Sequence, residues 1–149
     1  MYMLYIGSDH RGFNLKEALQ IYLKELGYDF EDFGAEKLNP DDDYPDFALA
    51  VAEKVAENPD ENRGILLCGS GVGVDIVANK IKGVRSALCF SAEQAKVSRN
   101  DDNTNVLSLP ADFISESLAK EIAAVWLETP YAALAHYERR LNKIKDIEK

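Results

Sequence analysis

The chain has 149 residues, of which 46% are hydrophobic and 29% charged, and its net charge at pH 7 is −9. This length suffices for a hydrophobic core that needs neither disulfides nor a structural metal. The acidic balance argues against nucleic acid or an anionic membrane surface as a partner, so an anionic substrate would need a local positive site. We therefore expect one domain over residues 1–149, with neither nucleic-acid nor membrane partners.

The few cysteines and histidines indicate the cellular compartment and bear on whether the protein binds a metal. The two cysteines, Cys68 and Cys89, lie in separate apolar runs and form no disulfide framework, which is typical of a reducing compartment. No apolar run approaches transmembrane length, and the first residues lack the basic region and apolar core of a signal peptide. A cytoplasmic protein is expected. Neither histidine, His10 or His136, belongs to a cluster with metal-ligand spacing, so no metal is expected.

Short apolar runs alternate with stretches of helical periodicity in the first half of the chain. The pattern predicts strands over 3–7, 28–34 and 64–69, and helices over 14–27 and 46–58. In the first helix, Asn14 and Glu17 fit an N-cap with its partner three residues later, and Gly27 fits the stop signal.

The same alternation continues to the end of the chain. Strands are predicted over 84–90 and 105–110, and helices over 74–81, 91–99, 115–128 (with Ser115 as its cap) and 131–149. The pattern predicts an α/β fold: a doubly wound, Rossmann-like sheet of five parallel strands with helices on both faces. Ligands of such sheets bind beyond the carboxyl ends of the strands. The apolar positions of the last helix, for example Leu141 and Ile144, could pack on the same domain or on a partner subunit.

A glycine-rich loop, "GSGVG", directly follows the strand that ends at Cys68. Gly69, Gly71 and Gly73 would let backbone N–H groups converge at a helix N-terminus, which is a site for negative charge. That charge could be a bound anion such as phosphate or an oxyanion that develops during a reaction; a tight turn without a ligand is the alternative. The spacing matches neither a P-loop nor the dinucleotide fingerprint, so nucleotide binding is disfavoured.

Cys68 and Ser70 add chemistry to this loop. A thiol between a strand end and a helix N-terminus is favoured as the thiolate, which can act as nucleophile or general base. The alternative is a small buried hydrophobic residue, which we expect for Cys89 in the middle of its strand. Ser70 could bond to a substrate oxygen or to Cys68, or it could be a turn residue.

A second polar group, Asp9, His10 and Arg11, ends the first strand. An acid, an imidazole and a guanidinium at one strand end could hold sugar hydroxyls and a phosphate. Solvation of the loop is the alternative.

Together these segments resemble a known family. "GSDHRGFNLKE", "DDYPDFA", "GILLCGSGVGVDIVANKIKGVRSAL" and "SRNDDNTNVL" are similar, in order and with matching gaps, to the type B ribose-5-phosphate isomerases. Galactose-6-phosphate isomerase subunits belong to the same family. The resemblance implies an aldose–ketose isomerase without cofactor or metal, which interconverts ribose 5-phosphate and ribulose 5-phosphate through an enediolate. It also implies a homodimer or homotetramer with sites between subunits.

The resemblance also implies roles for individual residues. Cys68 is the base that moves a proton between C2 and C1, and Ser70 assists it. Asp9 and Tyr44 lie near the sugar, and His10 lies near the phosphate. The enediolate oxygen is held by backbone N–H groups of the loop, which comprises Gly69, Gly71, Val72 and Gly73 besides Ser70.

Several positions depart from the family pattern. Asp101 stands where the family has the histidine assigned to ring opening, and Asp102 stands where it has asparagine. Asp112 replaces an arginine after the fifth strand, and His136 replaces the first of two arginines near the C-terminus, whereas Arg140 keeps the second. By the resemblance, two residues that would bind the phosphate are replaced.

Three readings follow from these departures. The main one is ribose-5-phosphate isomerisation. The first alternative is an isomerase of the same family for another sugar, with or without a phosphate group. The second is a non-catalytic sugar- or anion-binding protein, or the inactive partner in a hetero-oligomer. Retention of Cys68, Ser70 and the glycine loop argues against this last reading, because binding alone needs no thiolate base.

Overall fold

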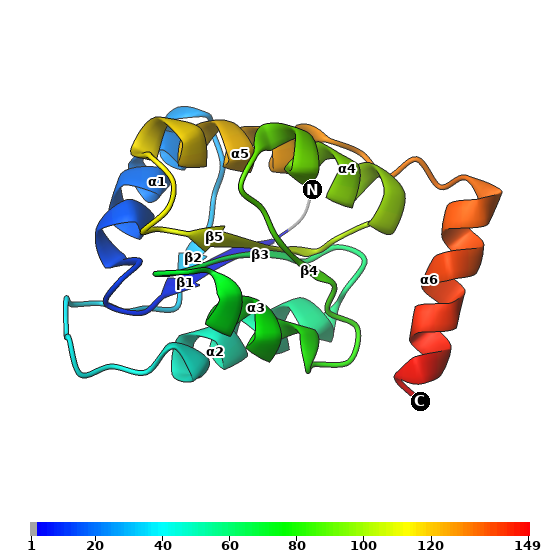
Figure 1. The fold of residues 1–149 in the computed structure, drawn as a ribbon, viewed down its shortest axis with the longest axis horizontal. Coiled ribbons are helices and arrows are strands. Elements are labelled where there is room, and N and C mark those ends of the chain that lie inside the picture. The colour runs from blue at the N-terminus through cyan, green and yellow to red at the C-terminus, as the bar shows by residue number, and fades with distance from the viewer. Residues whose placement is uncertain (1–2) are drawn as a thin grey trace.

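Residues 3–149, which the computed structural model describes, form a sheet of five parallel strands flanked by helices (Figure 1). The strand order is β2-β1-β3-β5-β4. The strands are β1 (Leu4–Ser8), β2 (Glu31–Asp32), β3 (Arg63–Cys68), β4 (Ser86–Leu88) and β5 (Val106–Pro110). The predicted doubly wound α/β sheet is confirmed.

Helices cover both faces of the sheet. One face carries α1 (Phe13–Glu25), α4 (Ala92–Asp102) and α5 (Glu116–Glu128), and the other carries α2 (Tyr44–Glu57) and α3 (Val72–Asn79) (Figure 1). The last helix, α6 (Ala135–Ile147), stands apart from both layers, beyond the amino ends of the strands (Figure 1). None of the helices within residues 3–149 has the length and apolar character needed to span a membrane.

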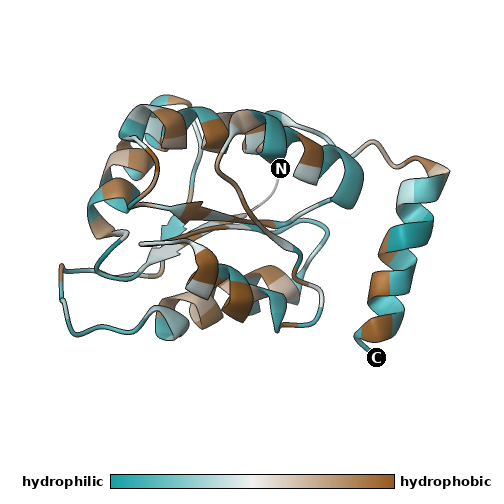
Figure 2. Cartoon of the chain, viewed as in Figure 1, coloured by the Kyte–Doolittle hydropathy of each residue, from teal (hydrophilic) through white to brown (hydrophobic). Residues whose placement is uncertain are grey.

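The sheet has a separate hydrophobic core on each of its two faces. Successive strand residues point to opposite faces, so a central strand is buried on both sides and its sequence is almost continuously apolar. Ile65 and Leu67 of β3 point into the core beneath α1, α4 and α5, which also holds Trp126. Leu66 and Cys68 of the same strand point into the core beneath α2 and α3. Apolar and polar residues alternate along the helices that cover these cores (Figure 2).

Several boundaries differ from the sequence-based expectation. The predicted N-cap at Asn14 is wrong, because α1 begins at Phe13 behind Gly12 and has no side-chain cap. Gly12 is needed there because a Cβ atom would lie 2.8 Å from the Cβ atom of Leu67. The cap at Ser115 is confirmed, since its Oγ accepts a hydrogen bond from the N–H of Leu118 (3.0 Å).

Four elements differ in length from the prediction by two residues or more. β4 has three residues instead of the predicted seven over 84–90, so Cys89 lies just beyond the strand rather than in its middle. β2 has two residues instead of the predicted seven over 28–34, because it pairs with β1 only at Glu31 and Asp32. α4 extends past residue 99 to Asp102, so the residues that depart from the family pattern there are helical. α6 begins at Ala135 rather than at 131, after an extended segment in which Ala133 has a φ of 53°.

The last helix makes few contacts with the rest of the chain. Among its residues only Leu141 is buried, and Glu148 just beyond it accepts a hydrogen bond from the N–H of Gly83 (2.7 Å). Ile144 and Ile147 remain exposed. The helix therefore packs on its own chain at a few points and leaves most of its apolar positions uncovered.

Candidate active site

The carboxyl ends of β1 and β3 lie side by side at the point where the strand order of the sheet reverses. Ser8, the last residue of β1, lies in register with Leu67 of β3. Asp9, the first residue after β1, and Cys68, the last residue of β3, are therefore neighbours at this edge of the sheet. The chain turns from β1 into α1 on one face and from β3 into α3 on the other (Figure 1). A crevice between diverging connections is the usual binding place of such sheets.

The glycine loop forms the N-terminus of α3. Gly71 is the N-cap residue with a φ of 74°, and the first intrahelical hydrogen bond runs from the N–H of Asp75 to the carbonyl of Gly71 (3.2 Å). The N–H groups before Asp75 therefore have no intrahelical acceptor, and the helix dipole adds positive potential beside them. Ser70 Oγ accepts a hydrogen bond from the N–H of Val72 (3.2 Å), which holds the loop in this shape.

Gly71 is required by both its conformation and its surroundings. A Cβ atom there would lie 2.5 Å from Leu88 Cδ1 and 3.1 Å from the backbone of Leu109 and Pro110. We expect Gly71→Ala to reduce the free energy of unfolding by about 2 kcal/mol or more, because left-handed strain of roughly 1–2 kcal/mol adds to the backbone clash. Urea denaturation measures the effect, and activity should fall with it.

Gly27→Ala is the matched control for this substitution. Gly27 also has a positive φ, 89°, but a Cβ atom there would meet nothing within 4 Å. The control should lose only the strain energy of about 1 kcal/mol and keep full activity. Equal losses of stability in the two variants would show that the packing of the loop against β5 contributes nothing.

Two side chains flank the loop. A Cβ atom on Gly69 would lie 2.2 Å from Arg11 Cζ, and one on Gly73 would lie 2.5 Å from Tyr44 Cε1, so the guanidinium and the phenol ring both rest on the loop backbone. Arg11 also forms an ion pair with Asp112. The residue that replaces an expected arginine thus holds another arginine beside the loop, a contact for which the sequence carried no signal.

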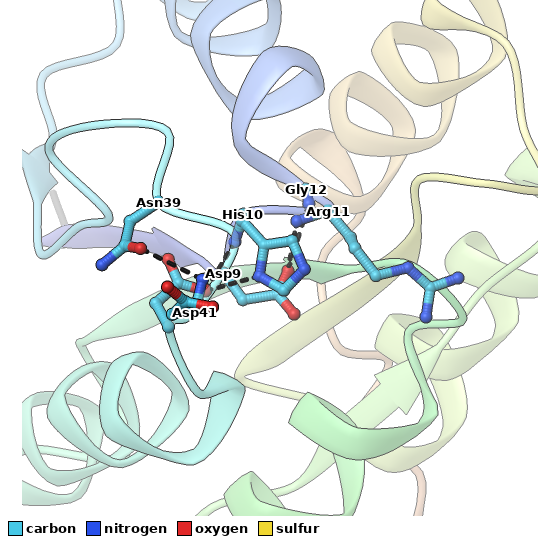
Figure 3. A network of polar contacts seen from close by, with 7 residues as sticks. Asp9, His10, Arg11, Gly12, Asn39 and Asp41 are labelled. Atoms are coloured by element: carbon cyan, nitrogen blue, oxygen red, sulfur yellow. Dashed lines mark hydrogen bonds and ion pairs between the residues drawn. The ribbon is translucent and has the colours of Figure 1, made fainter.

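The end of β1 carries a hydrogen-bonded network (Figure 3). Asp9 Oδ1 accepts hydrogen bonds from the N–H groups of Arg11 (3.0 Å) and Gly12 (3.1 Å). Asp42 Oδ1 accepts one from the N–H of His10 (2.9 Å) and lies 2.7 Å from His10 Nδ1. The hydrogen bond to Asp42 raises the pKa of His10 above its ordinary value, against a smaller opposing effect of desolvation.

Ligand atoms of Asp9, His10 and Asp42 lie within 4.8 Å of one another, which is close enough to hold a cation. Because Nδ1 of His10 is already paired with Asp42, we interpret the group as a hydrogen-bonded network. Asp42 was missed in the sequence, where it is one of three consecutive aspartates in a polar loop with nothing to distinguish it.

The two cysteines differ in their environments. Cys68 lies at the carboxyl end of β3, next to the glycine loop, and is 4% exposed. Cys89 lies in the opposite core, where burial and the charge of Asp75 raise its pKa to about 12. Cys89 therefore behaves as a buried hydrophobic residue.

The remaining residues singled out in the sequence form a second cluster at the other end of the sheet. Asp101 and Asp102 end α4, and His136 and Arg140 lie on α6, beyond the amino ends of the strands (Figure 1). Burial and the charge of Asp101 raise the pKa of Asp102, while Arg140 opposes this shift. Within one chain these four residues are not brought to the glycine loop.

A thiol beside a glycine loop, at the switch point of a doubly wound sheet, is the arrangement of an α/β enzyme whose loop N–H groups can stabilise negative charge. The family is established by comparison. The chain belongs to the Ribose/Galactose Isomerase family, whose profile matches residues 4–144, and it is an isomerase.

Individual relatives match over nearly the whole chain. A probable ribose-5-phosphate isomerase B of Mycoplasma genitalium is 42% identical over 146 residues, which cover 98% of this chain and 95% of that protein. A D-erythrulose-4-phosphate isomerase of Pectobacterium atrosepticum is 36% identical over 131 residues, which cover 88% of this chain and 86% of that protein. The crystal structure of ribose-5-phosphate isomerase B from Mycoplasma genitalium with bound ribulose-5-phosphate superposes with a TM-score of 0.95 at 40% identity, covering 99% of this chain and 96% of that one.

Proposed function

We propose that the protein interconverts ribose 5-phosphate and ribulose 5-phosphate. The observation that carries the proposal is the position of Cys68 beside the N–H groups of the glycine loop, at the strand edge where this fold binds ligands. Relatives named for ribose-5-phosphate isomerase B match 98–99% of the chain.

In the proposed reaction Cys68, as the thiolate, removes the proton from C2 of the open-chain aldose. The electron pair of that C–H bond forms the C1–C2 double bond, and the carbonyl π electrons move to O1. Loop N–H groups stabilise this charge, which exists only in the enediolate and the transition states around it. A proton then moves from the C2 hydroxyl to O1 with help from Ser70, and Cys68 returns its proton to C1. The product is the ketose.

The other residues near the loop would bind the substrate. Asp9 and Tyr44 would contact the sugar, and His10 would contact the phosphate. Arg11 rests on Gly69, so we add it as a second cation for the anionic end of the substrate. No cofactor or metal takes part in this scheme.

The second cluster, Asp101, Asp102, His136 and Arg140, would act in the site of a partner subunit. Its position beyond the amino ends of the strands supports an oligomer in which each active site uses two chains (Figure 1). We accordingly propose a homodimer, or a tetramer built from such dimers, of single-domain cytoplasmic subunits over residues 1–149. Asp101 would shuttle the proton that opens the sugar ring.

The primary test follows ribose 5-phosphate by proton NMR in deuterated water. We expect ribulose 5-phosphate to form, with solvent deuterium entering at the exchanging carbon. Unphosphorylated ribose and allose, and D-erythrulose 4-phosphate, are the comparison substrates. Preference for another sugar would favour the second candidate, a family member of altered specificity, which the Pectobacterium relative and the Asp112 and His136 positions support. No turnover of any sugar would favour a binding role.

Subunit complementation tests the shared site. Cys68→Ala and Arg140→Ala are each expected to be inactive alone. Unfolding and refolding a 1:1 mixture should restore about a quarter of the wild-type activity, since half of the dimers are mixed and each mixed dimer holds one intact site. A mixture as inactive as its components would contradict the arrangement.

A further inference from the structure

His10 is held by one carboxylate at two points. Asp42 Oδ1 accepts a hydrogen bond from the backbone N–H of His10 (2.9 Å) and lies 2.7 Å from its Nδ1 atom. Since a carboxylate only accepts, the proton of this second bond belongs to Nδ1. The ring is thereby fixed in one orientation, and Nε2 is left for an outside acceptor. The side chain of His10 is 27% exposed, so Nε2 can meet a ligand.

The loop that carries Asp42 is anchored to the sheet. After β2, Ala35 donates a hydrogen bond from its N–H to the carbonyl of Ser8 (2.7 Å), and Ser8 donates one to the carbonyl of Gly34 (2.7 Å). The buried Lys16 ammonium donates to the carbonyl of Ala35 (3.1 Å) and to both carboxylate oxygens of Asp32 (2.8 and 2.7 Å). These bonds fix the start of the loop, so that Asp42 meets a residue 32 positions earlier in the chain.

The groups facing His10 favour its charged form. Asp42 acts through the hydrogen bond and its charge, Asp9 adds a second negative charge, and Arg11 is the opposing cation. The Asp42 side chain is 9% exposed, and its Oδ2 atom is buried without a hydrogen-bond partner among residues 3–149. An aspartate needed only to tie the loop to β1 would not require a charge at this position, whereas an aspartate that stabilises an imidazolium does.

We propose that Asp42 is a positioning residue that holds His10 as a cation, with Nε2–H directed at the phosphate of the substrate. This inference rests on the proposed function for its substrate. A charged donor binds a phosphate dianion more strongly than a neutral one. The Asp42–His10 pair would thus supply part of the positive charge that is absent at Asp112 and His136, in a chain whose net charge is −9.

Kinetics of three variants test the role. Asp42→Asn keeps the size and an acceptor oxygen, and Asp42→Ala removes the contact. We expect KM for ribose 5-phosphate to rise roughly ten-fold in Asp42→Ala and less in Asp42→Asn at pH 6, with kcat nearly unchanged, because the lost interaction is a charged hydrogen bond outside the reacting carbons. Asp41→Asn, an exposed neighbour, is the control and should match the wild type.

The pH profile separates this role from a structural one. In the wild type KM should begin to rise only when His10 loses its proton, above its ordinary pKa, and in Asp42→Asn the rise should begin at lower pH. In His10→Asn the replacement of Asp42 should have no further effect on KM. Unchanged KM in both Asp42 variants, or the same pH profile with and without the carboxylate, would overturn the proposal.

A second readout does not depend on turnover. NMR titration of the histidine ring protons, with His136→Gln to assign the two signals, measures the pKa of His10 in the wild type and in Asp42→Asn. We expect a lower pKa in the variant, and a shift of the His10 signal with inorganic phosphate in the wild type only at pH values where the ring is charged. If ribose 5-phosphate is not turned over, this titration still decides the inference, and the proposed function alone fails. Identical titrations would reject the pairing.

Discussion

Replacing Cys68 with alanine is expected to lower kcat for ribose 5-phosphate by a factor on the order of 10²–10⁴, the usual contribution of a general base. The fold should persist, because the side chain is small and lies at the end of a strand. The measurement is proton NMR in deuterated water, which reports turnover and solvent exchange in one experiment. Both should disappear together, since the same group removes and returns the proton.

Cys89→Ala is the matched control for Cys68. This substitution also removes a thiol, but from a buried position in the opposite core. The raised pKa of Cys89 keeps its thiol protonated at neutral pH. We expect a modest loss of stability and full activity. Deuterium exchange that survives in Cys68→Ala would show that another group removes the proton, and the role proposed for the thiol would be wrong.

The largest effect on stability is expected from Asp32→Ala. Lys16 is fully buried, and its ammonium is held by both oxygens of Asp32 at 2.8 and 2.7 Å. Removing one partner of a buried pair costs about 3–5 kcal/mol, and we expect about 2–3 kcal/mol here because Asp32 is one-third exposed and partly screened by water. Urea denaturation at pH 7 measures the change, with the exposed Asp29→Ala as control.

The pH dependence of this effect follows from the shift of Asp32. Burial disfavours its carboxylate, but the hydrogen bonds from Lys16 and from the N–H of Gly34 outweigh burial and lower its pKa. A lowered folded-state pKa stabilises the protein above the ordinary value of about 4, and this contribution is lost as the pH falls through the folded value. The difference between wild type and Asp32→Ala should therefore shrink below about pH 4. A difference that stays constant down to pH 3 would contradict the ion pair.

The order of the elements could be predicted from the sequence because the hydrophobic periodicity of each segment agreed with the capping and glycine residues at its ends. β3 is a continuous apolar run bounded by glycine, and α5 has a serine that caps it in the structure. Element ends were less predictable where tertiary contacts decide them. β2 is short because only two residues pair with β1. α1 starts at Phe13, directly after Gly12, because the chain passes closely over Leu67 at that glycine.

The site was only partly visible in the sequence. Asp9, Cys68 and the glycine loop could be predicted to meet, since carboxyl ends of parallel strands share one edge. The pairing of His10 with Asp42 and of Arg11 with Asp112 depends on how two loops fold over that edge, and residues 32 and 101 positions apart carry no local signal of such contacts. Nor does the sequence reveal that Asp101 and Arg140 lie at the opposite end of the sheet.

The two cores put the two sulfur atoms on opposite faces of the sheet, since Cys68 points beneath α3 and Cys89 beneath α4 and α5. Side chains that point apart cannot form a disulfide without moving the backbone. An oxidised Cys68 therefore has no resolving thiol in its own chain, and its sulfenic acid can return to the thiol only through a small-molecule thiol or another protein. Oxidative inactivation of this protein would follow the supply of external reductant rather than any repair built into the fold.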